Sequence, residues 1–126
     1  MTLLLDTNAL LWILHDSPRL GSRARKALLD TPRILVSEIS LLEIAVKTSV
    51  GKLPAEPRLH STLRELGFER TGLDDRYLAR LEQLPVLHRD PFDRLLIAQA
   101  LTDNVQVLTA DRAFTRYGVT IVDAGR

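Results

Sequence analysis

Residues 1–15 read M-T-L-L-L-D-T-N-A-L-L-W-I-L-H, an apolar run that stops at an aspartate and then becomes apolar again. The short stretch Leu3 to Leu5, bounded by the turn-forming Asp6-Thr7-Asn8, is typical of a strand buried on both faces. Asn8 to His15 then predicts a helix. A carboxylate at the end of a buried strand has two interpretations, since it either caps the next helix or holds a metal ion.

The rest of the chain continues this alternation of strand and helix. Further strands are predicted at 33–36, 68–71, 105–109 and 119–122, and further helices at 22–29, 37–50, 59–66, 74–84, 91–102 and 111–117. Ser22 is expected to cap its helix, and Gly51 and Gly67 to end theirs. Strands that alternate with helices imply a parallel sheet covered on both faces. Because no repeat, low-complexity segment or linker interrupts the pattern, we expect one α/β domain over residues 1–126.

The composition of the 126 residues limits the class of protein. Hydrophobic residues make up 45% of the chain, which is enough for a core. No apolar run approaches the roughly 20 residues of a membrane span, and the start lacks the basic region of a secretory signal. The chain has no cysteine, which excludes disulfides and thiolate metal sites. A cytoplasmic protein is the expectation.

The net charge of +1 argues neither for nor against a nucleic-acid partner, but the basic residues are unevenly divided. Lysine occurs only at positions 26, 47 and 52, so most of the 17 basic residues are arginine. The planar guanidinium fork of arginine suits phosphate. Genomic codon bias explains the same excess equally well.

Four acids occupy comparable positions along the predicted elements. Asp6 and Asp111 follow strands, while Glu43 and Asp93 lie early in helices. Ligand sites of open parallel sheets lie outside the carboxyl ends of the strands, so we expect the four side chains to meet there.

Each acid also has a capping explanation. Asp6 and Asp111 are possible N-caps, and Ser40-Leu41-Leu42-Glu43 has the form of a capping box. Asp90-Pro91-Phe92-Asp93 supplies a cap, a proline at the first helical position and an acid favoured by the helix dipole. Taken singly, each acid is explained by capping.

Taken together, the four carboxylates would repel one another unless a cation neutralised them. Oxygen ligands in a chain without cysteine favour Mg²⁺, with Mn²⁺ as an alternative. Such ions activate water and stabilise charge at phosphodiesters. This interpretation depends on the predicted sheet, because convergence in space is not visible in a sequence.

Four segments together resemble a known family. They are L-L-L-D-T-N-A-L-L-W at 3–12, S-E-I-S-L-L-E-I-A at 37–45, H-R-D-P-F-D-R-L-L-I-A-Q-A at 88–100 and L-T-A-D at 108–111. They resemble the PIN domain and, more narrowly, the VapC-type toxin of a VapBC toxin–antitoxin pair. The similarity spans the chain in the family's order. The D-T-N segment alone is a weak signal, whereas the third segment combined with the others is a strong one.

The resemblance implies a PIN-like fold with a five-stranded parallel sheet flanked by helices on both faces. It implies a Mg²⁺-dependent endoribonuclease toxin of a type II toxin–antitoxin system, in which a metal-activated water leaves a 5′-phosphate and a 3′-hydroxyl. The family's catalytic and metal-binding acids fall on Asp6, Glu43, Asp93 and Asp111. The implied partners are an RNA substrate, a VapB-type antitoxin and a second copy of the chain in a homodimer.

Five further residues match the motifs as supporting members of the site. Thr7 and Asn8 lie where a hydroxyl or amide can steady a ligand, although ordinary turn chemistry explains them equally well. Asp90 is interpreted mainly as the cap before Pro91. Arg94 and Arg112 each follow a site acid and are candidates to contact phosphate or to hold the cluster together, with solvated surface preferred for Arg112.

Other residues have two interpretations each. Leu11 and Trp12 belong either to the core or to an apolar groove that receives the antitoxin's C-terminal segment. Lys47 and Lys52 face RNA or antitoxin acids, or form a solvated helix end. His88 is expected to orient its loop.

Particular residues argue against several other functions. A receiver domain needs a late lysine, and none follows Lys52. A haloacid-dehalogenase-type phosphatase needs a second aspartate where Asn8 stands. A histidine pair could cleave RNA without metal, but the spacing of His15, His60 and His88 does not favour it. A PIN-type RNA-processing nuclease outside a toxin–antitoxin pair and a non-catalytic RNA- or protein-binding module of the same fold remain open.

Overall fold

Five parallel strands form the centre of the fold, in the spatial order β3-β2-β1-β4-β5. The strands are β1 (Thr2–Leu5), β2 (Arg33–Ser37), β3 (Glu69–Thr71), β4 (Gln106–Thr109) and β5 (Ile121–Asp123). Every adjacent pair is parallel. The computed structural model describes residues 1–126 and confirms the expected five-stranded parallel sheet.

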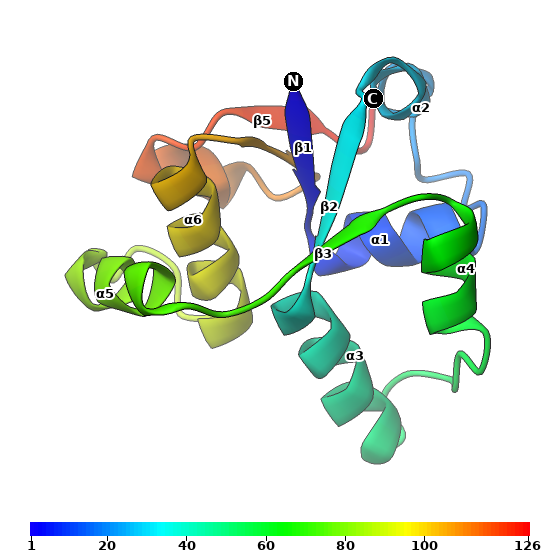
Figure 1. Ribbon diagram of the computed structural model, residues 1–126, viewed down its shortest axis with the longest axis horizontal. Helices are drawn as coiled ribbons and strands as arrows, with labels where there is room; N and C mark the ends of the chain where they lie inside the picture. Colours follow the sequence, from blue (N-terminus) through cyan, green and yellow to red (C-terminus); the bar gives the residue numbers. More distant parts are fainter.

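Helices cover both faces of this sheet (Figure 1). They are α1 (Thr7–Leu14), α2 (Ser22–Asp30), α3 (Glu38–Ser49), α4 (Leu59–Glu65), α5 (Asp75–Gln83), α6 (Pro91–Asp103) and the 3-10 helix η1 (Arg112–Tyr117). α1, α2 and α4 pack on one face, while α5, α6 and η1 pack on the other. α3 extends beyond the ends of β1 and β2 (Figure 1). No helix is long and apolar enough to cross a membrane.

The three leucines of β1 explain why two cores form. Leu3 and Leu5 pack into the core on the α1 side, whereas Leu4 packs into the core on the α6 side. Successive side chains of a strand point to opposite faces, so a strand with helices on both sides is apolar at every position. All three leucines are at most 2% exposed.

The register of the central strands lines up the first residues after them. Leu5 lies opposite both Val36 of β2 and Leu108 of β4. Asp6, Ser37 and Thr109, each one residue further on, therefore lie in a row at the carboxyl edge of the sheet. The row is held by the backbone N–H of Asp6, which donates to the carbonyl oxygen of Leu108 at 3.1 Å.

Several predicted strand boundaries were wrong by one or two residues, including the start of β3 at Glu69 instead of residue 68 and the end of β2 at Ser37 instead of residue 36. β4 begins at Gln106 instead of residue 105, and β5 spans Ile121–Asp123 instead of 119–122. Val119 is buried in the core before the strand starts. The apolar side chain of Val119 therefore indicates burial in the core and not a place in the strand.

The predicted cap at Ser22 was also wrong. Gly21 occupies the cap position of α2, and no side chain accepts a hydrogen bond there. The backbone N–H of Arg23 donates instead to the carbonyl oxygen of Arg126 at 2.7 Å. A β-carbon at Gly21 would lie 2.1 Å from the carbonyl carbon of Arg126, so this close approach requires glycine.

Candidate functional site

Asp6 lies between β1 and α1, at the carboxyl edge of the sheet. It is buried, with 5% of its surface exposed. Its Oδ1 accepts from the backbone N–H of Ala9 at 2.7 Å, which makes it the N-cap of α1. Its Oδ2 accepts from the Thr109 hydroxyl at 2.5 Å. Burial raises the pKa of Asp6 to about 6; these two hydrogen bonds oppose the rise, and the charges of Asp111 and Glu43 add to it.

Glu43 lies in the interior of α3 and is 5% exposed. Ser37 caps this helix, so the predicted capping box of Ser40 and Glu43 was wrong. The Thr7 hydroxyl donates to Glu43 Oε1 at 2.7 Å and lies 3.0 Å from the Ser40 hydroxyl. Lys47 Nζ donates to the other carboxylate oxygen at 2.5 Å. Both oxygens of Glu43 are therefore held in place.

Asp90 caps α6 as predicted, with Pro91 at the first helical position. Its Oδ1 accepts from the backbone N–H groups of Phe92 at 2.8 Å and Asp93 at 3.3 Å. This cap fixes the first turn of α6, from which the side chain of Asp93 projects toward the sheet edge.

Asp93 shows that the acids of different elements influence one another. Burial raises its pKa to about 7, followed by the negative charge of Asp90. His88 opposes this shift, while the charges of Asp6 and Glu43 increase it. The acids from β1, α3 and α6 therefore lie close enough to disfavour one another's ionisation.

Asp111 completes the group from the end of β4. Its Oδ1 accepts from the backbone N–H of Ala113 at 2.9 Å and caps η1. Its own backbone N–H donates to the Thr109 hydroxyl oxygen at 2.9 Å. Thr109 thus connects Asp6 directly to Asp111, and all four acids predicted from the sequence gather at one edge of the sheet.

His88 lies between two of these acids. Its Nε2 is 3.0 Å from Asp111 Oδ2 and 3.1 Å from Asp93 Oδ2. Donor atoms of these three side chains lie within 4.8 Å of one another, a spacing compatible with a bound ion. The sequence predicted only that His88 orients its loop.

Of the supporting residues in this part of the fold, Thr7 contacts a site acid, whereas Asn8 and Arg94 do not. Thr7 is buried against Glu43, whereas the side chain of Asn8 is exposed. The guanidinium of Arg94 donates to the carbonyl oxygens of Pro85 at 2.9 Å and Leu84 at 3.4 Å. Arg94 therefore holds the loop that precedes α6.

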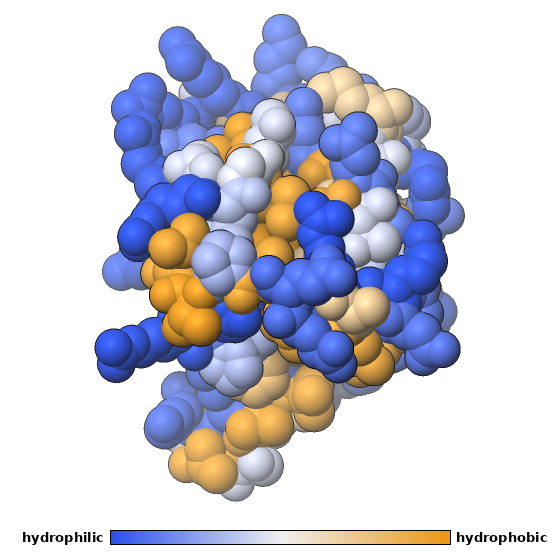
Figure 2. Space-filling view, turned by 90° about the vertical axis from the view of Figure 1, so that its left-hand side faces the viewer, coloured by the Kyte–Doolittle hydropathy of each residue, from blue (hydrophilic) through white to orange (hydrophobic).

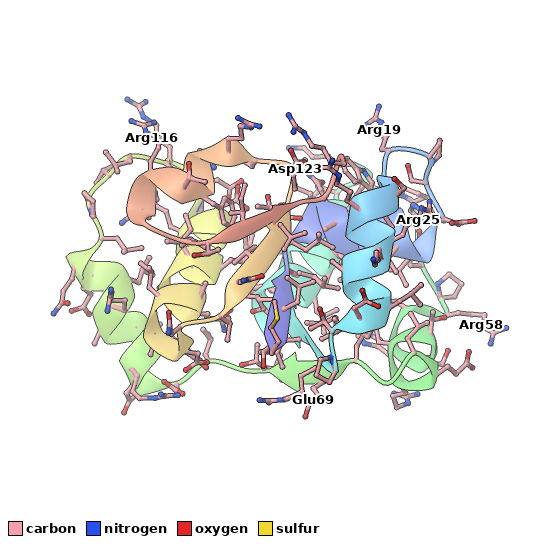
Figure 3. The ribbon with its side chains drawn as sticks, turned by 90° about the horizontal axis from the view of Figure 1, so that it is seen from above. Arg19, Arg25, Arg58, Glu69, Arg116 and Asp123 are labelled. Atoms are coloured by element: carbon pink, nitrogen blue, oxygen red, sulfur yellow. The ribbon has the colours of Figure 1, made fainter.

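Most other arginines face solvent. Arg112 is exposed at the start of η1, in agreement with the preferred interpretation. The labelled Arg19, Arg58 and Arg116 point outward from the fold in Figure 3. The excess of arginine is thus distributed over the surface and not concentrated at the acids.

Three residues at or near the site were missed from the sequence. Lys47 lies four residues after Glu43, a helical spacing that would have indicated the ion pair. Thr109 stands at the end of a predicted strand, where its hydroxyl could have been foreseen at the site edge. Gln99 is 2% exposed and accepts from the Ser37 hydroxyl at 2.7 Å, which joins α6 to β2. A single glutamine in an apolar helix carries no sequence signal of that partner.

The donor set fits a hard divalent cation. Four carboxylates and the hydroxyls of Thr7 and Thr109 supply oxygen, which Mg²⁺ and Mn²⁺ prefer. Of the basic groups, only Lys47 and His88 contact the four acids. Burial is the main cause of the raised pKa values of Asp6 and Asp93, and the charges of neighbouring acids add to it.

The site lies apart from the largest cavity of the molecule. That cavity, about 680 Å³, is lined by Thr2, Arg33, Glu69, Asp103 and neighbouring residues toward the other end of the strands. None of the four acids contributes to it.

The chain belongs to the PIN domain family, whose model matches residues 3–119. PIN domains are nucleases, so this membership suggests hydrolase activity. The resemblance seen in the four sequence segments is therefore confirmed. No curated protein matches the chain in sequence.

Several solved structures share the fold over nearly their whole length. VapBC2 from Rickettsia felis, bound to a DNA fragment from its promoter, is 19% identical with a TM-score of 0.74, and the match covers 98% of each chain. DNA-bound VapBC from Salmonella typhimurium is 22% identical with a TM-score of 0.72, again over 98% of each chain. FitAcB from Neisseria gonorrhoeae is 19% identical with a TM-score of 0.70, over 97% of each chain.

Proposed function

We propose that this protein is a metal-dependent endoribonuclease that acts as the toxin of a type II toxin–antitoxin pair in the cytoplasm. The observation that carries the proposal is the convergence of Asp6, Glu43, Asp93 and Asp111, with the pKa of Asp6 raised to about 6 and that of Asp93 to about 7. Burial and mutual repulsion both disfavour the charged forms of these acids, so the cluster is unfavourable unless a cation neutralises it.

Each acid has a separate role in this proposal. Asp6, Asp93 and Asp111 hold the ion, and Glu43 either binds it or orients water. When bound, Mg²⁺ or Mn²⁺ neutralises the carboxylates, lowers the pKa of water and stabilises charge on the phosphodiester. Thr109 keeps Asp6 in position, and Thr7 and Lys47 do the same for Glu43.

Groups held in this way need little reorganisation before reaction. Arg112 is exposed beside Asp111, which agrees with the interpretation of a solvated arginine, so no contact with the substrate is assigned to it.

The proposed partner is a VapB-type antitoxin, as in the VapBC complexes that share the fold. A groove of about 310 Å³ lies between α3 and α4 and is lined by Leu41, Ile44, Ala45 and Leu59, among others. Leu11 and Trp12 of α1 are half-buried against the same core. An apolar groove of this kind suits the apolar side of an inserted peptide segment.

A homodimer is also part of the proposal. Leu42, Val46 and Val50 of α3 are 51%, 43% and 63% exposed and recur every four residues. They form one apolar stripe, and Figure 2 shows apolar surface at the lowest part of the molecule, where α3 ends.

Val46→Asp should therefore shift a dimer to monomer in light scattering, whereas the exposed Leu29→Asp should not.

The decisive experiment is cleavage of end-labelled RNA by the purified protein without antitoxin. Cleavage is measured with Mg²⁺, with Mn²⁺ and with excess chelator, for the wild type and for Asp6→Asn and Asp93→Asn. The exposed Asp30→Asn is the matched control. We expect cleavage that requires the ion, products with 5′-phosphates, and a loss of more than about 100-fold in both site variants.

Other outcomes favour the alternatives. Cleavage that survives chelation would return the histidines as candidates. The absence of cleavage under every condition would favour a binding module. Cleavage without growth arrest on expression in cells would favour an RNA-processing nuclease outside a toxin–antitoxin pair.

A further inference from the structure

His88 is fixed from several sides before any ion binds. Its ring packs edge-on against Phe114, with centroids 6.5 Å apart and planes at 86°. Its backbone N–H donates to the Tyr117 hydroxyl at 2.8 Å, as does that of Leu87 at 3.0 Å. Arg94 holds the same loop through its carbonyl groups. The orientation of the imidazole is therefore determined by its surroundings.

The backbone selects one tautomer of this imidazole. The N–H of Asp90 points at His88 Nδ1 from 3.1 Å, so Nδ1 must accept a hydrogen bond. A neutral imidazole that accepts at Nδ1 carries its proton on Nε2. That Nε2–H is directed at Asp111 Oδ2 at 3.0 Å, next to Asp93 Oδ2 at 3.1 Å.

A metal bond through Nε2 would require the opposite arrangement. An imidazole that binds metal through Nε2 in the neutral form carries its proton on Nδ1. The Nδ1–H would then face the N–H of Asp90, which is already ordered in the cap that begins α6. Two donors would oppose each other, so the close spacing of His88, Asp93 and Asp111 does not make His88 a ligand.

We propose that His88 is a positioning residue, locked as the Nε2–H tautomer, that donates to Asp111 beside Asp93 and holds it in place for the ion without binding the ion. The proposal rests on the proposed function, because it assigns His88 a role toward the same site. It leaves a donor set of oxygen alone, which favours Mg²⁺ and Mn²⁺ over ions that prefer nitrogen. Loss of such an outer hydrogen bond lowers metal affinity about 10- to 100-fold.

The direct test is the ¹⁵N spectrum of the histidine rings in the full-length protein at pH 8, with and without Mg²⁺. We expect the Nε2–H pattern for His88 in both samples, with Nε2 still protonated when Mg²⁺ is present. His88→Gln assigns the signals, and the exposed His60→Gln is the control. An Nδ1–H tautomer, or loss of the Nε2 proton on addition of Mg²⁺, would overturn the proposal.

The second test is Mn²⁺ affinity by calorimetry in variants that differ only in what they offer the acids. His88→Leu removes the donor and should weaken binding about 10- to 100-fold. His88→Gln carries an amide N–H at the position of Nε2 and should recover most of the affinity. His60→Leu should bind as the wild type does. Equal losses in His88→Leu and His88→Gln would contradict a donor role.

Failure of the proposed function is distinguishable from failure of this inference. If neither Mg²⁺ nor Mn²⁺ binds the wild type, the metal-dependent nuclease fails. The spectrum of the metal-free protein still decides whether His88 donates to the acids.

Discussion

Asp6 and Asp74 are both N-cap aspartates, yet their surroundings shift their pKa values in opposite directions. Asp74 caps α5 through the N–H groups of Arg76 and Tyr77, and the Arg76 guanidinium donates to its second oxygen at 2.9 Å. That hydrogen bond lowers the pKa of Asp74. Burial among other acids instead raises the pKa of Asp6 to about 6.

The comparison shows that capping and site chemistry do not exclude each other. Asp6, Asp90 and Asp111 all cap helices, as the local sequence suggested for each of them. Helix starts bring these carboxylates to the sheet edge, and the neighbours that meet them there decide the rest. A capping explanation is therefore no argument against a functional one.

The largest expected effect is stabilisation of the folded protein by an ion that binds at Asp6 and not at Asp74. An ion at one hundred times its Kd stabilises the folded state by about 2.7 kcal/mol, roughly 10 °C in Tm. We expect this shift with Mn²⁺ in the wild type and in Asp74→Asn, and its loss in Asp6→Asn. Differential scanning fluorimetry measures it. An equal shift in all three proteins would locate the ion elsewhere.

The next effect concerns the metal-free protein. The folded pKa of Asp93 is about 7, above its ordinary 3.8, so its favourable contribution exists at low pH and is lost as pH rises through about 7. Asp93→Asn should therefore stabilise the metal-free protein at pH 8, by about 2 kcal/mol, and have little effect at pH 5. Urea denaturation at both pH values tests this.

Asp74 provides the opposite control for that measurement. Its lowered pKa gives stability that is present at neutral pH and lost as pH falls. A gain in stability for Asp74→Asn at pH 8, or a loss for Asp93→Asn, would reverse the assignment of the two environments.

Thr109→Val should have a smaller effect with a distinct pH dependence. In the wild type, the Thr109 hydroxyl donates to Asp6 and lowers the pKa of that acid. The variant removes this hydroxyl. We expect a cost of about 1.5 kcal/mol at pH 8 and less at pH 5, where Asp6 is protonated in either protein. Thr109→Ser retains a hydroxyl and should behave as the wild type in the same denaturation experiment.

The smallest effect belongs to the exposed pair. Arg76→Gln leaves both backbone hydrogen bonds to Asp74 intact, because they come from main-chain N–H groups. The pKa of Asp74, followed by NMR, should rise toward its ordinary value while Tm hardly changes, since exposed ion pairs contribute little. A large fall in Tm would show that the guanidinium, and not the cap, stabilises the start of α5.

Much of the fold was predictable because its signals are local. Apolar runs such as Leu3 to Leu5 and stops such as Gly51 and Gly67 depend only on neighbouring residues, and they predicted the order of elements. The error at Ser22 arose where a distant segment intervenes. At Gly21 the deciding contact is with Arg126, which no pattern near residue 21 reveals.

The site was predictable in its acids but not in what holds them. The four acids stood out because Asp6 and Asp111 follow strands, whereas Glu43 and Asp93 lie early in helices. The roles of Thr109 and His88 depend on strand register and on the side of the ring that meets Asp90. Ser40 and Glu43 have the spacing of a capping box, but Ser37 is the N-cap of α3. Ser40 therefore lies in the first turn of the helix and does not cap it.

The hydrogen bond between Asp6 and Thr109 joins residues 103 positions apart. During synthesis, Thr109 is added 103 residues after Asp6, and Asp111 follows it. β1 is the central strand, and its partner β4 is also late. The four acids therefore cannot come together until the ribosome has added β4 and the residues that follow it.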